Sequence, residues 1–475
     1  MNTVAVIGAS YGGNRAAQLL SKELPEGWRI VLVDRNSHMN HLYVFPRFAI
    51  LPEHGHKAFI PYTNLLVKSC PEDMQRHAFL HAYVTSIDMH SLTLSCAFPE
   101  HGVNENDRTL HFDYLVYALG SHLPAPINVW GSVDTEAEKE NTIVHDGTKA
   151  KGISWLKRFR GMVERTNSVL VVGGGALGIQ YATDTAEVWP NKRVTLLHSR
   201  KQLLPRFDEA MHEEIITTLS ELNIKVILGE RLDLSAPPKI VVNESGMEER
   251  IARTRSGRAL HTGVVASGIS STRLQPGPNI RLHSSSAPVK RPTDLLREAL
   301  PDAIVPDGPS KDMVRVSRTM QVAVCRQTRE AQEDASVEGL QDVLARVSIA
   351  ESFAPTSLAV PEEVEVPYPH LFAVGDVADA FGAIKAGHTA HYQAEVAARN
   401  ILTLIQQEMS PSHPAPKLEH YAPGAPAIKL SLGLSQAVYQ VQGVVGRKTD
   451  VSADRDALSM WNYYGINPTE ETMCL

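Results

Sequence analysis

Two glycine-rich turns are the features of this sequence that most clearly indicate a chemical function. Gly8-Ala9-Ser10-Tyr11-Gly12-Gly13 and Gly173-Gly174-Gly175-Ala176-Leu177-Gly178 each follow a short hydrophobic run. Glycines in such turns let the backbone approach a pyrophosphate, which accepts hydrogen bonds from the N–H groups that start the next helix. Two such turns predict two dinucleotides. Hydride transfer from a nicotinamide cofactor to FAD is the simplest chemistry that uses both.

The first turn has the flanking elements that a dinucleotide site requires. Residues 4–7 predict a buried parallel strand, and residues 14–24 have apolar positions at helical spacing. Ser10 stands where a second glycine is usual, although its small hydroxyl can still donate to phosphate. Asp34 closes the next predicted strand, where a carboxylate can accept from ribose hydroxyls. The alternative is an ordinary glycine-rich loop before a helix.

The second turn contains the complete G-x-G-x-x-G pattern, at Gly173, Gly175 and Gly178. Residues 168–172 predict the preceding strand, and residues 179–188 predict the following helix. We therefore expect the nicotinamide cofactor at this turn.

The strand after the second turn ends in His198-Ser199-Arg200, without the carboxylate that is usual in an NAD site. Ser199 and Arg200 can hydrogen-bond and neutralise a 2'-phosphate, so we expect NADPH to be accepted as well as NADH. The alternative is an Arg200 that faces solvent and tolerates either cofactor.

Two further segments resemble the paired signatures of FAD-binding pyridine-nucleotide oxidoreductases: residues 113–121 and residues 371–376, the second ending in Gly375-Asp376. The resemblance implies that Asp376 binds the ribitol chain of FAD; the alternative is a helix N-cap. It also implies that the helix of residues 378–402 points its first amides at the flavin. Lys385 and His388 would lie nearby, or would be solvated surface residues.

Nearly the whole chain resembles the apoptosis-inducing-factor-like flavoproteins known as AMID or ferroptosis suppressor protein, of the fungal type, which are related to type II NADH dehydrogenases. Residues 41–47, 194–200, 369–376 and 383–388, and a short domain from about residue 424, carry this resemblance. It implies an NAD(P)H oxidoreductase that passes electrons through FAD to a quinone-like acceptor. The alternative is a pyridine-nucleotide sensor or cell-death effector with little turnover.

The candidate cofactor-binding residues form two sets, one for each turn, and no catalytic residue and no metal ligand is assigned. The FAD set is Gly8, Ser10, Gly12, Gly13, Asp34, Arg35, Arg47, Val84, Ala118, Gly120, Gly375, Asp376, Lys385, Gly387 and His388. The nicotinamide set is Gly173, Gly175, Gly178, Gln180, Ser199 and Arg200.

The sequence departs from the family pattern in three places. Gln180 stands where many relatives have a glutamate beside the nicotinamide. The usual Thr-Gly near the end of the second site is replaced by Ala266-Ser267-Gly268. Segments 269–291 and 325–358 fit no family element, and ordered loops, disordered insertions and translated intron all remain open for them.

Composition excludes several functional classes. The net charge of −7, without a long basic run, gives no support to nucleic-acid binding. The four cysteines form no C-x-x-C or C-x-x-x-x-C pair, so a dithiol relay is not expected. The chain enters its first strand without room for a targeting segment, and Asn2 excludes N-myristoylation. We expect a cytoplasmic protein, with at most peripheral membrane contact.

The predicted fold is α/β, with two Rossmann-like dinucleotide-binding domains, the second inserted in the first, and a small C-terminal α+β domain. The FAD domain would comprise residues 1–125 and 366–408, and the NAD(P)H domain residues 126–300. An irregular connection would cover 301–365, and the C-terminal domain 409–475. The oligomeric state is not predicted.

Overall fold

The structure is a computed structural model. The structure describes residues 1–62, 64–66, 76–121, 128–130, 145–233, 235, 239–242, 248–267, 292–325, 364–411, 414 and 416–474. Most of segments 269–291 and 325–358, which fit no family element, therefore lies outside the described residues, and so does Gly268.

The first domain is built on a five-stranded parallel sheet with the strand order β20-β9-β1-β2-β5. Its central strands are largely apolar and are buried on both faces, as parallel sheets covered by helices require. The strands are β1 (Asn2–Ile7), β2 (Trp28–Asp34), β5 (Ala78–His81), β9 (Tyr114–Tyr117) and β20 (Leu371–Ala373).

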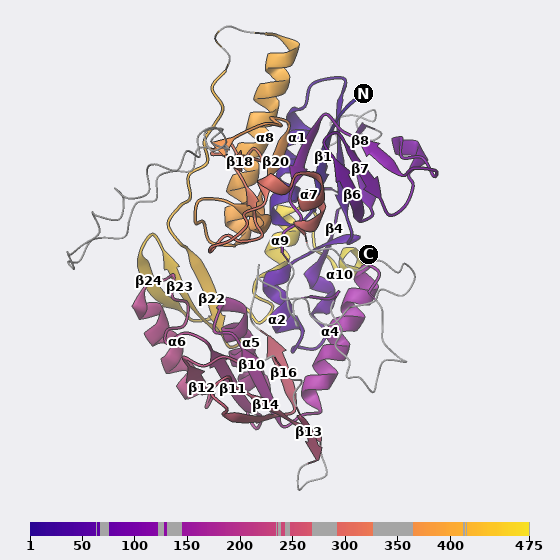
Figure 1. Ribbon diagram of the computed structural model, residues 1–475. Helices are drawn as coiled ribbons and strands as arrows, with labels where there is room; N and C mark the ends of the chain where they lie inside the picture. Colours follow the sequence, from indigo (N-terminus) through magenta and orange to yellow (C-terminus); the bar gives the residue numbers. More distant parts are fainter. Residues whose placement is uncertain are drawn as a thin grey trace, which may run out of the picture.

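Two long helices pack against each other beside this sheet (Figure 1). They are α1 (Tyr11–Glu23), which begins at the first glycine-rich turn, and α8 (Gly387–Met409). Smaller elements complete this part of the chain: β3 (His38–Asn40) paired with β4 (Phe59–Pro61), α2 (Phe45–Phe48), and an antiparallel sheet of β6 (Val84–Asp88), β7 (Ser91–Leu94) and β8 (Thr109–His111).

The second domain has a four-stranded parallel sheet with the order β12-β11-β10-β16. Its strands are β10 (Ser168–Val172), β11 (Arg193–His198), β12 (Lys225–Leu228) and β16 (Val264–Ser267). The helices are α4 (Lys149–Glu164), α5 (Ala176–Val188) and α6 (Glu209–Glu221), and an antiparallel sheet is made of β13 (Lys239–Val242), β14 (Glu248–Arg253) and β15 (Ala259–Thr262).

The chain order of the strands confirms that the second domain is inserted in the first. β9 and β20 are neighbours in the first sheet, and all strands of the second sheet lie between them in the sequence. The two glycine-rich turns therefore belong to separate sheets of one nested α/β fold.

Residues 292–325 correct the expected domain boundaries. The sequence assigned them partly to the NAD(P)H domain and partly to an irregular connection, but they pack into the core of the first domain. Val322 N donates to Leu371 O at 2.8 Å, so this segment lies beside β20. Its elements are α7 (Asp294–Ala299), β17 (Val314–Arg315) paired with β21 (Ala378–Asp379), and β18 (Val324–Cys325) paired with β19 (Val364–Glu365). The sequence did not predict these strands because each is only two residues long, too short to show a hydrophobic period.

The C-terminal region contains strands and helices, as predicted, and contacts both larger domains. Its antiparallel sheet packs near α5 and α6 (Figure 1), whereas Trp461 and Tyr464 belong to the core of the first domain. Its elements are β22 (Ile428–Leu432), β23 (Gln436–Val441), β24 (Val444–Lys448), α9 (Ala457–Tyr463) and α10 (Glu470–Cys474).

Candidate functional site

The first glycine-rich turn leaves no room for a side chain at Gly8 or Gly13. Gly8 has φ of +90°, and a Cβ added there would lie 2.4 Å from the carbonyl oxygen of Ala118. A Cβ added at Gly13 would lie 1.7 Å from the carbonyl oxygen of Gly8. Ser10 is the extended residue before α1, and its side chain makes no capping hydrogen bond. The turn is therefore a bare backbone cradle at a helix N-terminus, which is the geometry that a pyrophosphate needs.

Asp34 lies at the end of β2 and holds the first turn in place. Its Oδ2 accepts from the backbone N of Ala9 at 2.6 Å, and its Oδ1 accepts from the backbone N of Asn36 at 2.7 Å. Burial raises the pKa of the Asp34 carboxyl, and these backbone hydrogen bonds oppose the shift. The carboxyl group lies beside the turn, where a bound dinucleotide would place a ribose.

Arg35 belongs to an aromatic cluster that sequence reasoning missed. Its guanidinium carbon lies 4.6 Å from the ring centroid of Trp130, whose indole N–H donates to Asn36 Oδ1 at 2.9 Å. His145 meets the same indole edge-on at 4.6 Å. Both nitrogens of His145 are buried without a hydrogen-bond partner in the described part of the chain. Burial lowers the pKa of His145 to about 4, so the imidazole is neutral near pH 7.

Asp376, which the resemblance implies as a flavin ligand, lies beside the end of β9. It is the second residue of the short 3-10 helix Gly375–Val377, which begins after Val374, so Asp376 does not act as an N-cap. Its Oδ2 accepts from Ser121 Oγ at 2.8 Å. Gly375 has φ of +81°, and its N–H donates to Gln393 Oε1 at 2.7 Å. These bonds hold Gly375 and Asp376 between Ser121, which follows β9, and α8.

The start of α8 holds three of the candidate residues. Gly387 N donates to Tyr43 Oη at 2.6 Å, and Lys385 Nζ donates to Ala378 O at 2.6 Å. His388 is exposed as a whole residue, but partial desolvation of its ring lowers its pKa. Lys385 is therefore anchored to the neighbouring backbone. The exposure of His388 fits the alternative interpretation, a solvated surface residue.

The remaining FAD candidates occupy different surroundings. Ala118 is buried and its N–H donates to Ile7 O at 2.9 Å, so it lies against the first turn. Gly120 follows with φ of +72°. Gly12 lies close to Ala390 of α8. Val84 begins β6, where it pairs with Leu94.

Two buried polar side chains at this site lack partners among the described residues. Asn14, in the first turn of α1, has neither its amide nitrogen nor its oxygen bonded, although only 1% of the residue is exposed. Thr389 Oγ1, in the first turn of α8, is also buried without a partner. Because unsatisfied buried polar atoms are costly, their presence at both helix starts fits a site that takes a polar cofactor such as FAD.

The second glycine-rich turn is built in the same way. Gly173 has φ of +113°, and Gly175 is the extended residue before α5. A Cβ added at Gly174 would lie 2.2 Å from Leu203 Cδ2. Gly178 is buried within α5. The three glycines of the motif thus surround the start of α5, which begins three residues before the predicted start at residue 179.

His198 takes the place that Asp34 has in the first domain. Ile7 pairs with Val33 and Val172 pairs with Leu197, so Asp34 and His198 are each the next residue of the neighbouring strand. Asp34 accepts from Ala9 N, and His198 Nδ1 accepts from Gly174 N at 3.0 Å. The usual pattern has a carboxylate at this position, so the imidazole of His198 was not among the candidate residues.

The hydrogen bond to Gly174 fixes the tautomer of His198. Because Nδ1 accepts, the proton of the neutral ring lies on Nε2. Burial lowers the pKa of His198, and the charge of Arg200 adds to the effect. Ser199 and Arg200 follow at the exposed end of the strand. The second site therefore presents no carboxylate at this position, which is compatible with a 2'-phosphate.

Gln180 lies in α5, two residues after the second glycine-rich turn. The residue is 3% exposed, and its Oε1 has no hydrogen-bond partner in the described part of the chain. A neutral carboxamide with an unbonded acceptor can receive an N–H donor, such as a nicotinamide carboxamide, without the charge of a glutamate.

Arg47 has a different place from the one expected of a cofactor ligand. Its guanidinium is fully buried, and Nε and Nη2 donate to the two carboxylate oxygens of Asp184 at 2.8 and 2.9 Å. It also donates to Ala453 O at 2.7 Å and to Gly433 O at 2.6 Å. These bonds occupy the guanidinium with protein groups, so Arg47 joins α2 to α5 and to the C-terminal region instead of facing a cofactor.

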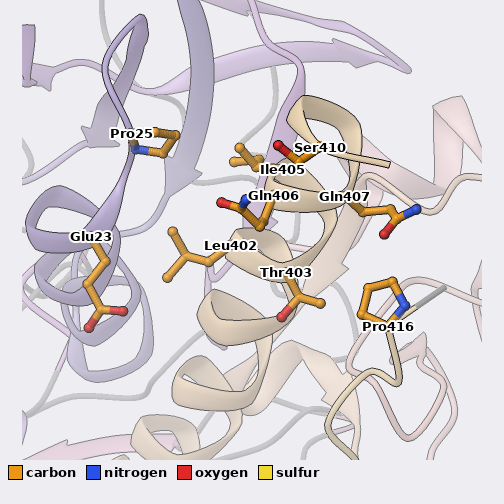
Figure 2. Close-up of a pocket in the computed structure, with 9 residues that line it drawn as sticks. All are labelled: Glu23, Pro25, Leu402, Thr403, Ile405, Gln406, Gln407, Ser410 and Pro416. Atoms are coloured by element: carbon orange, nitrogen blue, oxygen red, sulfur yellow. The ribbon is translucent and has the colours of Figure 1, made fainter. Parts of the chain in front are cut away.

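A surface groove of about 410 Å³ lies away from both turns, between the C-terminal ends of α1 and α8 (Figure 2). Glu23 and Pro25 line one side, and Leu402, Gln406 and Ser410 line the other. At 1.5 Å per helical residue, Glu23 is about 18 Å along α1 from Tyr11, so this groove is separate from the first turn.

Comparisons with known proteins cover both glycine-rich turns. The model of the family described as pyridine nucleotide-disulphide oxidoreductase matches residues 2–270. Fe-regulated protein 8 of Mycosarcoma maydis is 38% identical over 98% of this chain and 95% of its own. Human ferroptosis suppressor protein 1 is 23% identical over 94% of this chain and 90% of its own.

Two solved structures share the fold over nearly the whole chain. The sulfide:quinone oxidoreductase of Aquifex aeolicus superimposes with a TM-score of 0.59 at 16% identity, covering 99% of this chain and 94% of that one. NDH2 of Plasmodium falciparum, in complex with NADH, gives 0.58 at 11% identity, covering 100% and 96%. Within the described residues, no helix combines the length and apolar character needed to cross a membrane.

Proposed function

The chain belongs to the pyridine nucleotide-disulphide oxidoreductase family, and from this premise we propose that it transfers electrons from NAD(P)H through FAD to a quinone-like acceptor. FAD and NAD(P)H are its cofactors. Bound FAD would supply the redox chemistry, as acceptor of hydride from the nicotinamide and donor of electrons to the acceptor. The contribution of this chain is to bind, orient and shield the reacting groups.

The proposal rests on one observation: each of the two domains has a glycine-rich turn at a helix start, and one domain is inserted in the other. The turn at Gly8–Gly13, Asp34 and Asp376 would hold FAD, with the unpartnered amide of Asn14 beside the cradle. The turn at Gly173–Gly178 would hold the nicotinamide cofactor.

The acceptor is inferred from relatives and from the cysteines. A full-length structural neighbour is named a sulfide:quinone oxidoreductase, which supports a quinone-like acceptor. The sequence has no C-x-x-C or C-x-x-x-x-C pair through which a dithiol relay could run. Short-chain quinones are therefore the acceptors to test first.

We propose that NADPH is accepted and that Arg200 reads its 2'-phosphate. Arg200→Glu should lower kcat/KM for NADPH by the factor that corresponds to about 1.5–3 kcal/mol, the free energy of a charge-assisted hydrogen bond. The kcat/KM for NADH should change much less. Arg193→Glu is a matched control, because Arg193 is an exposed arginine at the opposite end of the same strand. Equal losses for both cofactors with Arg200→Glu would show that this side chain does not recognise the phosphate.

Steady-state oxidation of NADH and NADPH, with and without a short-chain quinone, tests the proposed function. Added quinone should raise the rate well above the rate with dissolved oxygen alone. If quinone adds nothing while the purified protein binds FAD and NAD(P)H, the result favours a pyridine-nucleotide sensor, a role consistent with relatives named apoptosis-inducing factor homologs.

A further inference from the structure

Three aromatic side chains gather at the start of α8. The ring centroids of Tyr11 and Tyr43 are 5.2 Å apart, and His41 lies 6.0 Å from Tyr43 and 6.3 Å from Tyr11. Tyr11 Oη is 3.0 Å from His41 Nδ1, so these two groups share a hydrogen bond. Since α1, the segment before α2 and α8 all meet here, the cluster lies among the elements assigned to the FAD site.

Tyr43 differs from its neighbours in its exposure and in its hydrogen bonding. The residue is 38% exposed, whereas His41 is 7% exposed. The Tyr43 hydroxyl accepts from Gly387 N at 2.6 Å, and among the described residues no acceptor is found for its own proton. A Cβ added at Gly387 would lie 3.0 Å from Tyr43 Oη and 2.8 Å from the ring of Tyr11, so the glycine permits this approach.

Charged groups from two other elements face the Tyr43 hydroxyl. Asp376, in the short helix before α8, raises the pKa of Tyr43 after the larger effect of burial. The Gly387 amide and Arg455 oppose this shift. Arg455 comes from the C-terminal region and donates to Tyr43 O. Arg455 and the next residue, Asp456, both have positive φ, 59° and 55°, a costly backbone that directs Arg455 into the cluster.

Reduction of a quinone by NAD(P)H requires a proton from outside the two reactants. One NAD(P)H, one proton and one quinone give one NAD(P)⁺ and one hydroquinone, so hydride supplies both electrons and only one of the two new O–H protons. A side chain that donates this proton must carry it near neutral pH and must reach the acceptor.

The other members of the cluster are poorly suited to donate that proton. Burial, with a smaller effect from the charge of Arg455, lowers the pKa of His41 to about 3, so His41 is not an imidazolium near pH 7. The Tyr11 hydroxyl is engaged in a hydrogen bond with His41 Nδ1. Tyr43 retains an available phenolic proton and a partly exposed position.

We propose that Tyr43 is a catalytic residue of the acceptor half of the reaction, donating its phenolic proton to the quinone oxygen as the acceptor is reduced. The Tyr43 O–H bond breaks and the hydroquinone O–H bond forms, while the electron pair comes from NAD(P)H. The phenolate left behind accepts from the Gly387 amide and faces Arg455, and it regains a proton from water. This inference rests on the proposed quinone-reducing function.

Tyr43→Phe keeps the ring and removes the proton. With NADPH and a short-chain quinone, we expect the kcat of the variant to fall about 100-fold, within the usual range for general acid catalysis. Ferricyanide takes one electron without a proton, so its reduction by the same variant should stay within about twofold of wild type, which also reports intact folding and cofactor loading. Calorimetric titration of the resting protein with the quinone should show at most about tenfold weaker binding, as for the loss of one hydrogen bond.

Tyr392→Phe is the matched control, because Tyr392 is an exposed tyrosine of α8 and should leave both rates unchanged. In wild type, quinone reduction should slow about twofold or more in D₂O while ferricyanide reduction does not. Wild-type quinone turnover that is insensitive to Tyr43→Phe and to D₂O would overturn the role of Tyr43 and leave the proposed function intact. Absence of wild-type quinone turnover would overturn both.

Discussion

Replacement of Arg47 by methionine is predicted to cause a large loss of stability. Arg47 is completely buried and forms a bidentate ion pair with Asp184, which is also completely buried. The same guanidinium binds carbonyls of Gly433 and Ala453 in the C-terminal region. The substitution would therefore leave a carboxylate and two carbonyl oxygens without their donor in one step.

The expected magnitude follows from this burial. Removing one partner of a buried ion pair costs about 3–5 kcal/mol, because the remaining charge stays desolvated and uncompensated. Burial already raises the pKa of Asp184, and Arg47 opposes this rise. Loss of Arg47 should raise the pKa of the carboxyl further, so protonation would reduce part of the cost near neutral pH.

Urea unfolding of the FAD-loaded protein measures this effect. Trp461 in the C-terminal region is fully buried, so its fluorescence should report release of that region. Arg447→Met is the matched control: Arg447 pairs with Glu214 between the C-terminal region and α6, but their side chains are 37% and 40% exposed. Exposed pairs contribute about 0–1 kcal/mol, so this control should unfold close to wild type.

The double variant Arg47→Met with Asp184→Leu separates the charge effect from packing. Replacing both partners by apolar groups removes the uncompensated charge, so the double variant should be more stable than Arg47→Met alone. If Arg47→Met and Arg447→Met lose the same small amount of stability, the buried ion pair of Arg47 does not stabilise the packing of the C-terminal region as described.

Further predictions concern the first glycine-rich turn and the acid side of the stability profile. Gly13→Ala should abolish retention of FAD, since the new Cβ would lie 1.7 Å from a carbonyl oxygen, whereas Gly424→Ala, in open space, should bind one flavin per chain like wild type; flavin absorbance of the purified proteins checks this. Asp454, 2.9 Å from Lys57, has a partly buried carboxyl whose pKa is lowered: burial opposes the shift, but hydrogen bonds from Lys57 and Ser452 outweigh it. Its contribution should therefore be fully present above the unfolded pKa of about 4 and lost as pH falls through the folded value, and Lys57→Met should flatten this acid-side loss in thermal unfolding.

The nucleotide turns could be predicted from the sequence because their determinants are local. Gly8, Gly13 and Gly173 are required by backbone conformation or close approach within a few residues, and the strands on either side are continuous apolar runs. The insertion of one domain in the other followed from the order of those turns and Gly375-Asp376.

Other parts of the site depend on contacts that leave no local signal. Arg47 meets Asp184 across 137 residues, and Tyr43 meets the first amide of α8 across 344 residues. His198 was overlooked because an imidazole in place of a carboxylate is not part of the expected pattern, although strand register puts it at the equivalent position. Segment 292–325 joined the first core through short strands whose apolar residues have no clear periodicity.

Anaerobic stopped-flow mixing tests the central claim most directly. The FAD-loaded protein is first reduced with one equivalent of NADPH or NADH and is then mixed with a short-chain quinone, while the flavin absorbance is followed. We predict rapid loss of the oxidised flavin signal in the first step and its rapid return in the second, with one hydroquinone formed per NAD(P)H consumed. Return of the signal no faster than with dissolved oxygen alone would contradict the proposed electron transfer to quinone.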